Sequence, residues 1–390
     1  MNFSLFYQLL ESHSNHGNAH FLQGVVSELQ ELGHRVRVFE PDHGWNRKSL
    51  LKEHGTDALE QFREKDQNQV RVVYNRQTLD LEKVAAESDV IIVQSNEPWL
   101  VNGFGVLHNR LMRGAGPKNS FKLLFHDSHH RSVSDPAWLN RFRLDFYDGI
   151  LVFGKMLRNV YRKHGWSKYV WIWHEAADIR RFFPRYPSTE YPFGDLVWIG
   201  NWGDVERTGE LNQFLFHPVQ ALGLKCHIYG RHYPREILGL LKRQNIEYCG
   251  RLPNFHIPKV FANHAVSIQV PRRIYAGTWS GIPAIRPFEA LACGIPLITS
   301  PWQDNEGLFE SGKDFLVARD GDEMRQHLRT ILNDPGFALQ LAAHGLATIR
   351  EHHTCSHRVT QLLQIVAAQD ISGSDLQESA LCTDTLTTAE

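Results

Sequence analysis

The chain has 390 residues, of which 42% are hydrophobic and 22% charged, as in a folded protein with room for two domains. Its formal net charge of -1 argues against a nucleic acid as the main partner, because proteins that bind polyanions usually carry a basic excess. The 5 cysteines are scattered and never form a CxxC pair, so they predict reduced thiols instead of a disulfide framework or a zinc site.

The composition also predicts a cytoplasmic protein. No apolar run approaches the ~20 residues that cross a bilayer. The N-terminus, MNFSLFYQLLESHS, lacks the basic region and the small-residue cleavage site of a signal peptide. A neutral chain can still touch a bilayer through one face, so a peripheral contact with the inner face of a membrane stays open.

The first 184 residues alternate short apolar runs with helical patterns. After the first run, apolar residues at helical spacing predict a helix over 18–32, which Gly33 ends. Strands are expected at 3–9, 35–41, 70–74, 89–95, 121–127, 148–153 and 169–176. This alternation predicts parallel strands with helices on both faces of the sheet.

Residues 184–194, PRYPSTEYPFG, contain three prolines and predict a linker, after which the alternation restarts. Strands are expected at 195–200, 225–230, 246–250, 265–270, 296–300 and 314–318, and helices at 205–222, 235–243, 321–333, 336–350 and 357–369. We therefore expect a first domain at 1–184, a linker at 185–194, a second domain at 195–370 and a disordered polar tail at 371–390, with the last helix free to pack back on the first domain.

Two Rossmann-like α/β domains that face each other predict a site in the cleft between them, because open parallel sheets bind ligands at the carboxyl ends of their strands. In the first domain, Gly17 and Asn18 stand at the turn between the first strand and its helix, where free N–H groups can meet an anion. A plain turn and helix cap is the alternative.

The segment FHDSHHRS (125–132) follows a strand of the first domain. His126 and Asp127 are candidates for hydrogen bonds to substrate hydroxyls or for proton transfer. The nearby His129 and His130 raise the alternative of a metal site, but no HxH or HExxH spacing supports it, so we expect no metal.

In the second domain, WIGNWGDVERTGEL (198–211) joins a strand to a helix. The turn at Gly200, Asn201 and Gly203, followed by Arg207 in the first helical turn, suits a diphosphate, although a surface ion pair of Arg207 is the alternative.

Residues 270–294 gather arginines near one carboxylate, Glu289, that stands in an otherwise apolar run. A buried carboxylate is costly unless it neutralises, finds a partner or meets a ligand. The arginines of this segment are Arg272, Arg273 and Arg286.

With these motifs in order, the chain resembles the GT-B glycosyltransferases of the group 1 type, and among them the CgeB-like branch. Four segments carry the resemblance: HGNAHFLQGVVSELQELGHRVRVFEP, HEAADIRRFFP, IEYCGRLPNFHIPKVFANHAVSIQV and RPFEALACGIPLIT. The last is similar to the family's EAMACGxPVI motif and is the most specific of the four.

The resemblance implies a role for most of the candidate residues. Glu289 would accept hydrogen bonds from the ribose of a nucleotide sugar, and His126 would face the transferred sugar. The glycine turns would hold the diphosphate. The implied sugar-donor site comprises Gly17, Asn18, Gly200, Asn201, Arg207, Arg272, Arg286, Glu289, Ala290 and Leu291.

Two positions depart from the family pattern. Many relatives carry a first glutamate where this chain has Gly281, and Asn201 stands where an arginine is common. Arg272, Arg273 or backbone N–H groups of the following loop are candidates to replace the missing glutamate.

The resulting hypothesis is a glycosyltransferase that uses a UDP, GDP or dTDP sugar and an acceptor that is a glycan, a lipid or a protein. The resemblance favours retention of configuration without a metal, with Arg207 stabilising the leaving diphosphate. If the reaction inverts, Asp127 or His126 is the expected general base. The alternatives are a non-catalytic nucleotide-sugar binding protein of an envelope or spore, and a nucleotide-sugar epimerase.

Overall fold

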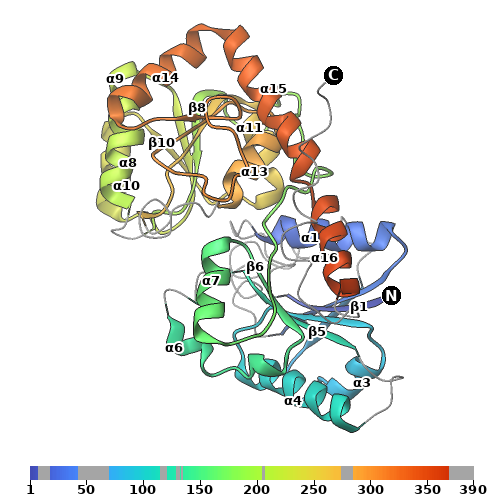
Figure 1. The fold of residues 1–390 in the computed structure, drawn as a ribbon. Helices are drawn as coiled ribbons and strands as arrows, with labels where there is room; N and C mark the ends of the chain where they lie inside the picture. The colour runs from blue at the N-terminus through green and yellow to red at the C-terminus, as the bar shows by residue number, and fades with distance from the viewer. Residues whose placement is uncertain are drawn as a thin grey trace.

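The computed structural model describes residues 1–7, 18–42, 70–114, 121–128, 132, 135–203, 207–273 and 284–368. Within these ranges the chain forms two α/β domains, each built on a parallel sheet (Figure 1). The predicted fold class is confirmed. The chain crosses between the domains near residue 184 and returns near residue 353, where Ala177 and Thr354 form a parallel bridge.

The first domain contains a seven-stranded parallel sheet among its described residues, in the order β3-β2-β1-β4-β5-β6-β7. Its strands are β1 (Asn2–Phe6), β2 (Arg35–Pro41), β3 (Val70–Tyr74), β4 (Val90–Val93), β5 (Lys122–Asp127), β6 (Gly149–Val152) and β7 (Val170–Ile172). The strand order reverses between β1 and β4, which makes the carboxyl end of β1 the expected ligand-binding point of this sheet. The strand expected at 169–176 ends at Ile172, and the rest of that segment leads toward the second domain.

The helices of the first domain include α1 (Asn18–Glu31), which connects β1 to β2. The other described helical elements are α3 (Leu81–Ala86), α4 (Pro98–Gly114), α6 (Pro136–Leu139), η2 (Leu144–Phe146) and α7 (Lys155–His164).

The second domain repeats this design with a six-stranded parallel sheet in the order β10-β9-β8-β11-β12-β13. Its strands are β8 (Gly194–Ile199), β9 (Cys226–Tyr229), β10 (Glu247–Gly250), β11 (His264–Gln269), β12 (Leu297–Thr299) and β13 (Leu316–Val317). The order reverses between β8 and β11, so the loops after these two strands form its expected ligand-binding edge.

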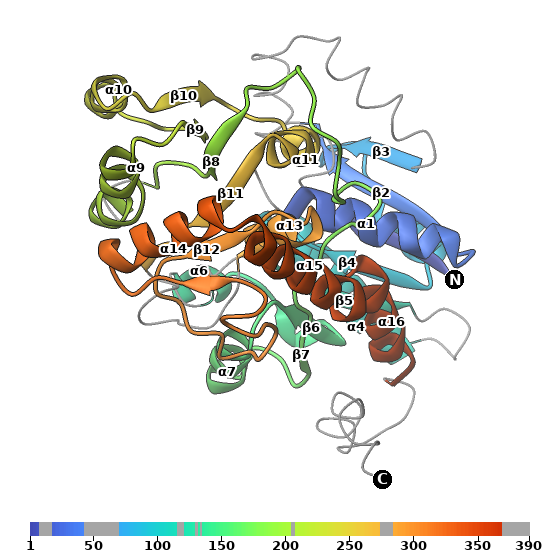
Figure 2. The same ribbon diagram turned by 90° about the horizontal axis from the view of Figure 1, so that it is seen from above.

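The described helices of the second domain surround this sheet (Figure 2). They are α8 (Thr208–Leu211), η4 (Asn212–Phe216), α9 (His217–Leu222), α10 (Arg235–Arg243), η5 (Asn254–His256), α11 (Ile257–Ala262), α13 (Ile285–Ala292), α14 (Gly321–Asn333) and α15 (Pro335–His352). The final helix, α16 (Cys355–Ala368), leaves this domain and lies against α1 of the first (Figure 1).

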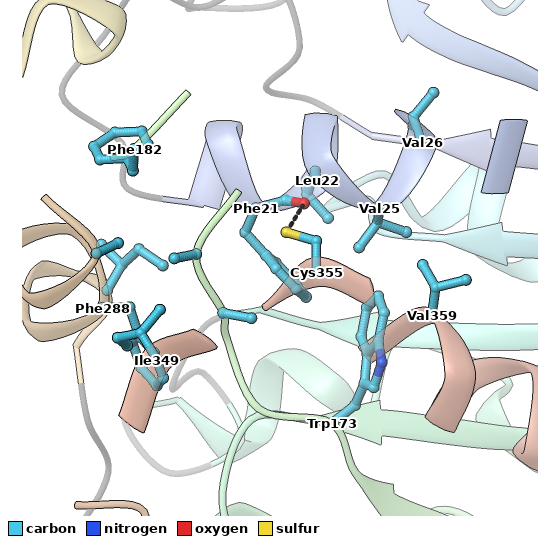
Figure 3. Close-up of a cluster of buried hydrophobic side chains, with 14 of the residues drawn as sticks. Phe21, Leu22, Val25, Val26, Trp173, Phe182, Phe288, Ile349, Cys355 and Val359 are labelled. Carbon is cyan, nitrogen blue, oxygen red and sulfur yellow. Dashed lines mark hydrogen bonds between the residues drawn. The ribbon is translucent and has the colours of Figure 1, made fainter. Parts of the chain in front are cut away.

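One apolar cluster runs through the junction of the two domains (Figure 3). It joins side chains of α1 with Trp173, with Phe288 of α13 and with Val359 of α16. The indole N–H of Trp173 donates to the carbonyl of Arg358 at 2.8 Å. The thiol of Cys355 donates to the carbonyl of Phe21 at 3.6 Å. Burial of this shared surface holds the returning helix in place.

The contact between α1 and α16 depends on Gly24. A Cβ at this position would collide with the Cys355 sulfur and lie 2.9 Å from the Cβ of Asp178. Neither neighbour is the free end of a long side chain, so the helices would have to separate.

We therefore expect Gly24→Ala to lower the free energy of unfolding by about 1–3 kcal/mol, because overpacking outweighs the gain in helix propensity. Gly209→Ala is the matched control, since nothing lies within 4 Å of its added methyl group. The control should be neutral or stabilising by up to about 1 kcal/mol in urea unfolding. Equal effects of the two substitutions would contradict the close contact.

Candidate functional site

Glu289 lies on α13 at the junction of the domains, with no exposed surface. Its Oε1 accepts a hydrogen bond from the Asn254 side-chain amide at 2.9 Å and lies 3.2 Å from His20 Nδ1. Its Oε2 accepts a hydrogen bond from the guanidinium of Arg286, which lies one helical turn earlier. His20 belongs to α1 of the first domain, so the carboxylate joins elements from both domains.

These partners decide the charge state of the carboxylate. Burial alone would raise the pKa of Glu289, but Arg286, His20 and Asn254 hold it below its ordinary value of 4.5. Glu289 is therefore ionised at neutral pH. The charge that looked misplaced in an apolar run is compensated by a neighbour on its own helix and by two groups from elsewhere in the chain.

A second buried carboxyl group, Glu175, lies close to this cluster. It follows β7 and is 9% exposed. Burial, followed by the negative charge of Glu289, raises the pKa of Glu175 to about 8, while Arg286 acts in the opposite direction. The two carboxyl groups are thus driven apart in pKa, which is a feature of functional sites.

The predicted glycine turn lies at the carboxyl end of β8. The Asn201 side-chain oxygen accepts a hydrogen bond from the N–H of Arg231 at 3.0 Å, which joins this turn to the loop after β9. Arg207 donates to the carbonyl of Asn201 at 2.9 Å and to the carbonyl of Val270 at 3.2 Å. The guanidinium therefore sits where the loops after β8 and β11 meet, at the reversal of strand order.

Gly203 leaves space for that arrangement. Its φ is +74°, and a Cβ there would lie 2.6 Å from Nε of Arg207. Only glycine combines this backbone conformation with room for the guanidinium.

The remaining arginines of the motif separate into different environments. Arg272 follows β11 at this same edge, and Arg286 is bound to Glu289. On the surface, Arg273 forms a bidentate pair with the carboxylate of Glu210, with hydrogen bonds of 2.9 and 3.2 Å.

In the first domain, His126 and Asp127 end β5 but face different neighbours. His126 is 3% exposed, and its ring meets those of Trp173 and Tyr7 edge-on, with centroids 4.9 and 6.1 Å apart. Asp127 accepts a hydrogen bond from the Tyr161 hydroxyl at 2.9 Å. His126 is thus enclosed by aromatic rings, whereas Asp127 is engaged with α7.

Some of the predicted positions contribute in other ways or lie outside the described residues. Ala290 and Leu291 are buried in the apolar core, and their carbonyl groups accept hydrogen bonds from the residues that follow α13. Asn18 begins α1, but its side chain is not described. Gly17, His129, His130 and Gly281 lie outside the described residues.

Sequence reasoning did not place His20, Asn254 or Glu175 in the site. His20 and Asn254 lie in two of the segments that carried the family resemblance, but nothing in their own spacing marks them as partners of Glu289. Glu175 had a weak signal, as a charged residue near the carboxyl end of the strand expected at 169–176.

The described ranges contain neither a metal-binding cluster of side chains nor a helix suited to cross a membrane. No three His, Cys, Asp or Glu side chains among those residues gather in an arrangement that could hold a metal ion. No helix in the described part of the chain is long and apolar enough to cross a membrane.

Residues 207–364 match a protein-family model described as glycosyl transferase-like. The second half of the chain carries a glycosyltransferase domain. The matched segment begins at Arg207 and contains Asn254, Arg286 and Glu289. No curated protein matches the chain at a significant level.

Solved structures match almost the whole chain. HepE of Anabaena, in complex with UDP and glucose, has a TM-score of 0.64 at 13% identity, covering 94% of this chain and 100% of its own. A glycosyltransferase of Rickettsia africae has a TM-score of 0.64 at 11% identity, covering 95% and 99%. The sucrose-phosphate synthase of Thermosynechococcus elongatus has a TM-score of 0.58 at 14% identity, covering 94% and 98%. These likenesses show the GT-B fold that the sequence predicted.

The Glu289 cluster predicts a measurable loss of stability. Glu289→Gln should lower the free energy of unfolding by about 3 kcal/mol, because it removes the negative charge that the buried His20 and the half-buried Arg286 face. Glu82→Gln is the control, since Glu82 and Arg110 form an exposed pair and its loss should cost less than about 1 kcal/mol.

The effect should also depend on pH. Because the folded pKa of Glu289 lies below its ordinary value of 4.5, its stabilisation is present above pH 4.5 and is lost as the pH falls through the folded pKa. Thermal unfolding at a series of pH values should therefore show the wild type and Glu289→Gln converging in acid. A difference that stays constant down to acid pH would contradict an ionised Glu289.

Proposed function

We propose that this chain transfers a sugar from a nucleoside-diphosphate sugar to an acceptor hydroxyl group. The observation that carries the proposal is the ionised Glu289, which lies inside the glycosyl transferase-like segment and is held by groups from both domains. Structures with the same fold support the donor class, since HepE was solved with UDP-glucose and an alpha-glucosyltransferase with UDP.

In this proposal the sugar donor lies mainly on the second domain. Its diphosphate lies near Arg207 and the loops after β8 and β11, where a guanidinium and backbone N–H groups compensate negative charge. The described residues give the N-terminus of α13 no side-chain cap, so its first N–H groups can also face an anion.

The ribose belongs at Glu289. A carboxylate has about four acceptor positions. Asn254, His20 and Arg286 approach three of them, and the carboxylate is fully buried. One acceptor position remains, but because the carboxylate is fully enclosed, a ribose hydroxyl can reach it only if a covering group such as His20 of the first domain moves away. We infer that the domains separate to admit the nucleotide, as in hinge closure around a ligand.

The acceptor belongs to the first domain. We propose a retaining reaction of the CgeB-like type that needs no metal and no bound cofactor. His126 faces the transferred sugar in this arrangement. If the reaction inverts instead, His126 is the better general base, because Tyr161 already occupies one oxygen of Asp127.

A thermal-shift screen with UDP, GDP and dTDP tests this function. Linkage predicts about 2.7 kcal/mol of stabilisation of the wild type at a hundredfold excess over the dissociation constant. Glu289→Gln should lose most of that gain. Stabilisation by none of the three nucleotides would contradict the proposal. If a nucleotide stabilises the protein but the protein releases no sugar from the corresponding nucleotide sugar, the result would indicate a non-catalytic binding protein.

The diphosphate contact has its own test. Arg207→Ala should weaken binding of the stabilising diphosphate by about tenfold or more, since a charge-assisted hydrogen bond contributes about 1.5–3 kcal/mol. Arg319→Ala removes the same charge from a side chain that is 84% exposed and pairs with Glu323 on the surface. Equal losses of affinity for the two variants in isothermal titration would indicate an effect of overall charge and contradict a direct contact between Arg207 and the diphosphate.

A further inference from the structure

Glu175 occupies a fixed position between the two domains. Ala177, two residues later, donates its N–H to the carbonyl of His353 at 2.9 Å. The preceding His174 lies 3.0 Å from Glu306 of the second domain, measured from Nε2 to Oε2. The residues before and after Glu175 are therefore both anchored to the second domain, and the Glu175 side chain is 9% exposed.

The carboxyl group of Glu175 has no hydrogen-bond or ion-pair partner among the residues that the structure describes. Its charged neighbours are paired with other residues. His174 pairs with Glu306, Asp178 with Arg181 at 3.1 Å, and Glu289 with Arg286. Neither carboxyl oxygen of Glu175 is among the fully enclosed, unpartnered side-chain atoms of the described residues, so the group keeps some access to a small molecule. A largely buried carboxyl group that has no protein partner among the described residues and keeps this access is a candidate for a ligand contact.

The surrounding charges favour the neutral form of Glu175. From α13, Glu289 disfavours its ionisation and Arg286 favours it, but Arg286 is bound to Glu289. On the first domain, His20 of α1 approaches Glu289. Beside Glu175 in the chain, His174 meets Glu306. Burial and Glu289 dominate and raise the pKa of Glu175 to about 8, so the group holds its proton at neutral pH.

A neutral carboxyl group has one O–H donor and acceptor oxygens, and a sugar hydroxyl likewise donates and accepts. A phosphate does not suit this position, because the ionised Glu289 nearby would repel it. The arginine that suits a phosphate, Arg207, lies at the loops after β8 and β11.

We propose that Glu175, as a neutral acid, binds a hydroxyl group of the nucleotide sugar, either on the ribose or on the transferred sugar. The inference rests on the proposed function and adds a contact from the first domain to the sugar donor. Binding in this way would also give the Glu175 carboxyl group a hydrogen-bond partner.

The test compares wild type, Glu175→Gln and Glu175→Ala for binding of UDP and UDP-glucose by isothermal titration between about pH 7 and about pH 9.5, across the raised pKa. Wild-type affinity should fall as the pH rises through about 8. Glu175→Gln should bind with little pH dependence, because its amide stays neutral. Glu175→Ala should bind about tenfold more weakly at neutral pH.

The two ligands separate the two hydroxyl sources. A loss for UDP-glucose alone would assign Glu175 to the transferred sugar, and a loss for both ligands would assign it to the ribose. Binding by the wild type with no change in either variant at any pH would overturn the Glu175 contact and leave the proposed function standing. No binding by the wild type would overturn both.

A measurement without ligand checks the protonation state. The native state should hold the Glu175 proton between pH 4.5 and about 8, so wild-type stability should fall with rising pH across that window and level off above it. Glu175→Gln removes this penalty, so its melting temperature should rise relative to the wild type from acid to pH 8. A constant difference would overturn the neutral acid.

Discussion

The arrangement of this protein depends on one negative charge that is buried between two domains. Glu289 has no contact with water, so its ionised form exists only because Arg286, Asn254 and His20 surround it. Because His20 comes from the first domain, the compensation is complete only when the domains are together. The charge state of Glu289 and the closure of the two domains are therefore coupled.

Other contacts across the junction make closure specific. Glu306 of the second domain accepts a hydrogen bond from the N–H of Lys155, at the start of α7, at 2.7 Å, and it also meets His174. In addition, α16 lies on α1, and Thr354, directly before α16, forms a parallel bridge with Ala177. Polar ties at one point and an apolar helix contact at another give the domains a preferred closed position. A sugar donor that replaces His20 at Glu289 would shift this balance, which links binding to domain motion.

The sequence predicted the architecture because strands buried on both faces appear as continuous apolar runs, and their alternation with helices specifies parallel sheets. It also singled out Glu289 as a carboxylate that requires a partner, whereas the role of Glu289 as a ribose acceptor stays a prediction. The partners themselves were not predictable, because Asn254 and His20 come together with Glu289 only in the folded chain. For the same reason, the sequence could not show that Tyr161 engages Asp127, or that Glu175 would lie near Glu289.

The most direct test of this account is a crystal structure of the protein with UDP, or with GDP or dTDP if one of these binds better. The account predicts a ribose hydroxyl within hydrogen-bond distance of the Glu289 carboxylate and a diphosphate beside Arg207. A nucleotide at the opposite edge of the second sheet would contradict it. That edge has a hollow of about 550 Å³ lined by residues that include Lys225, His227 and Lys242.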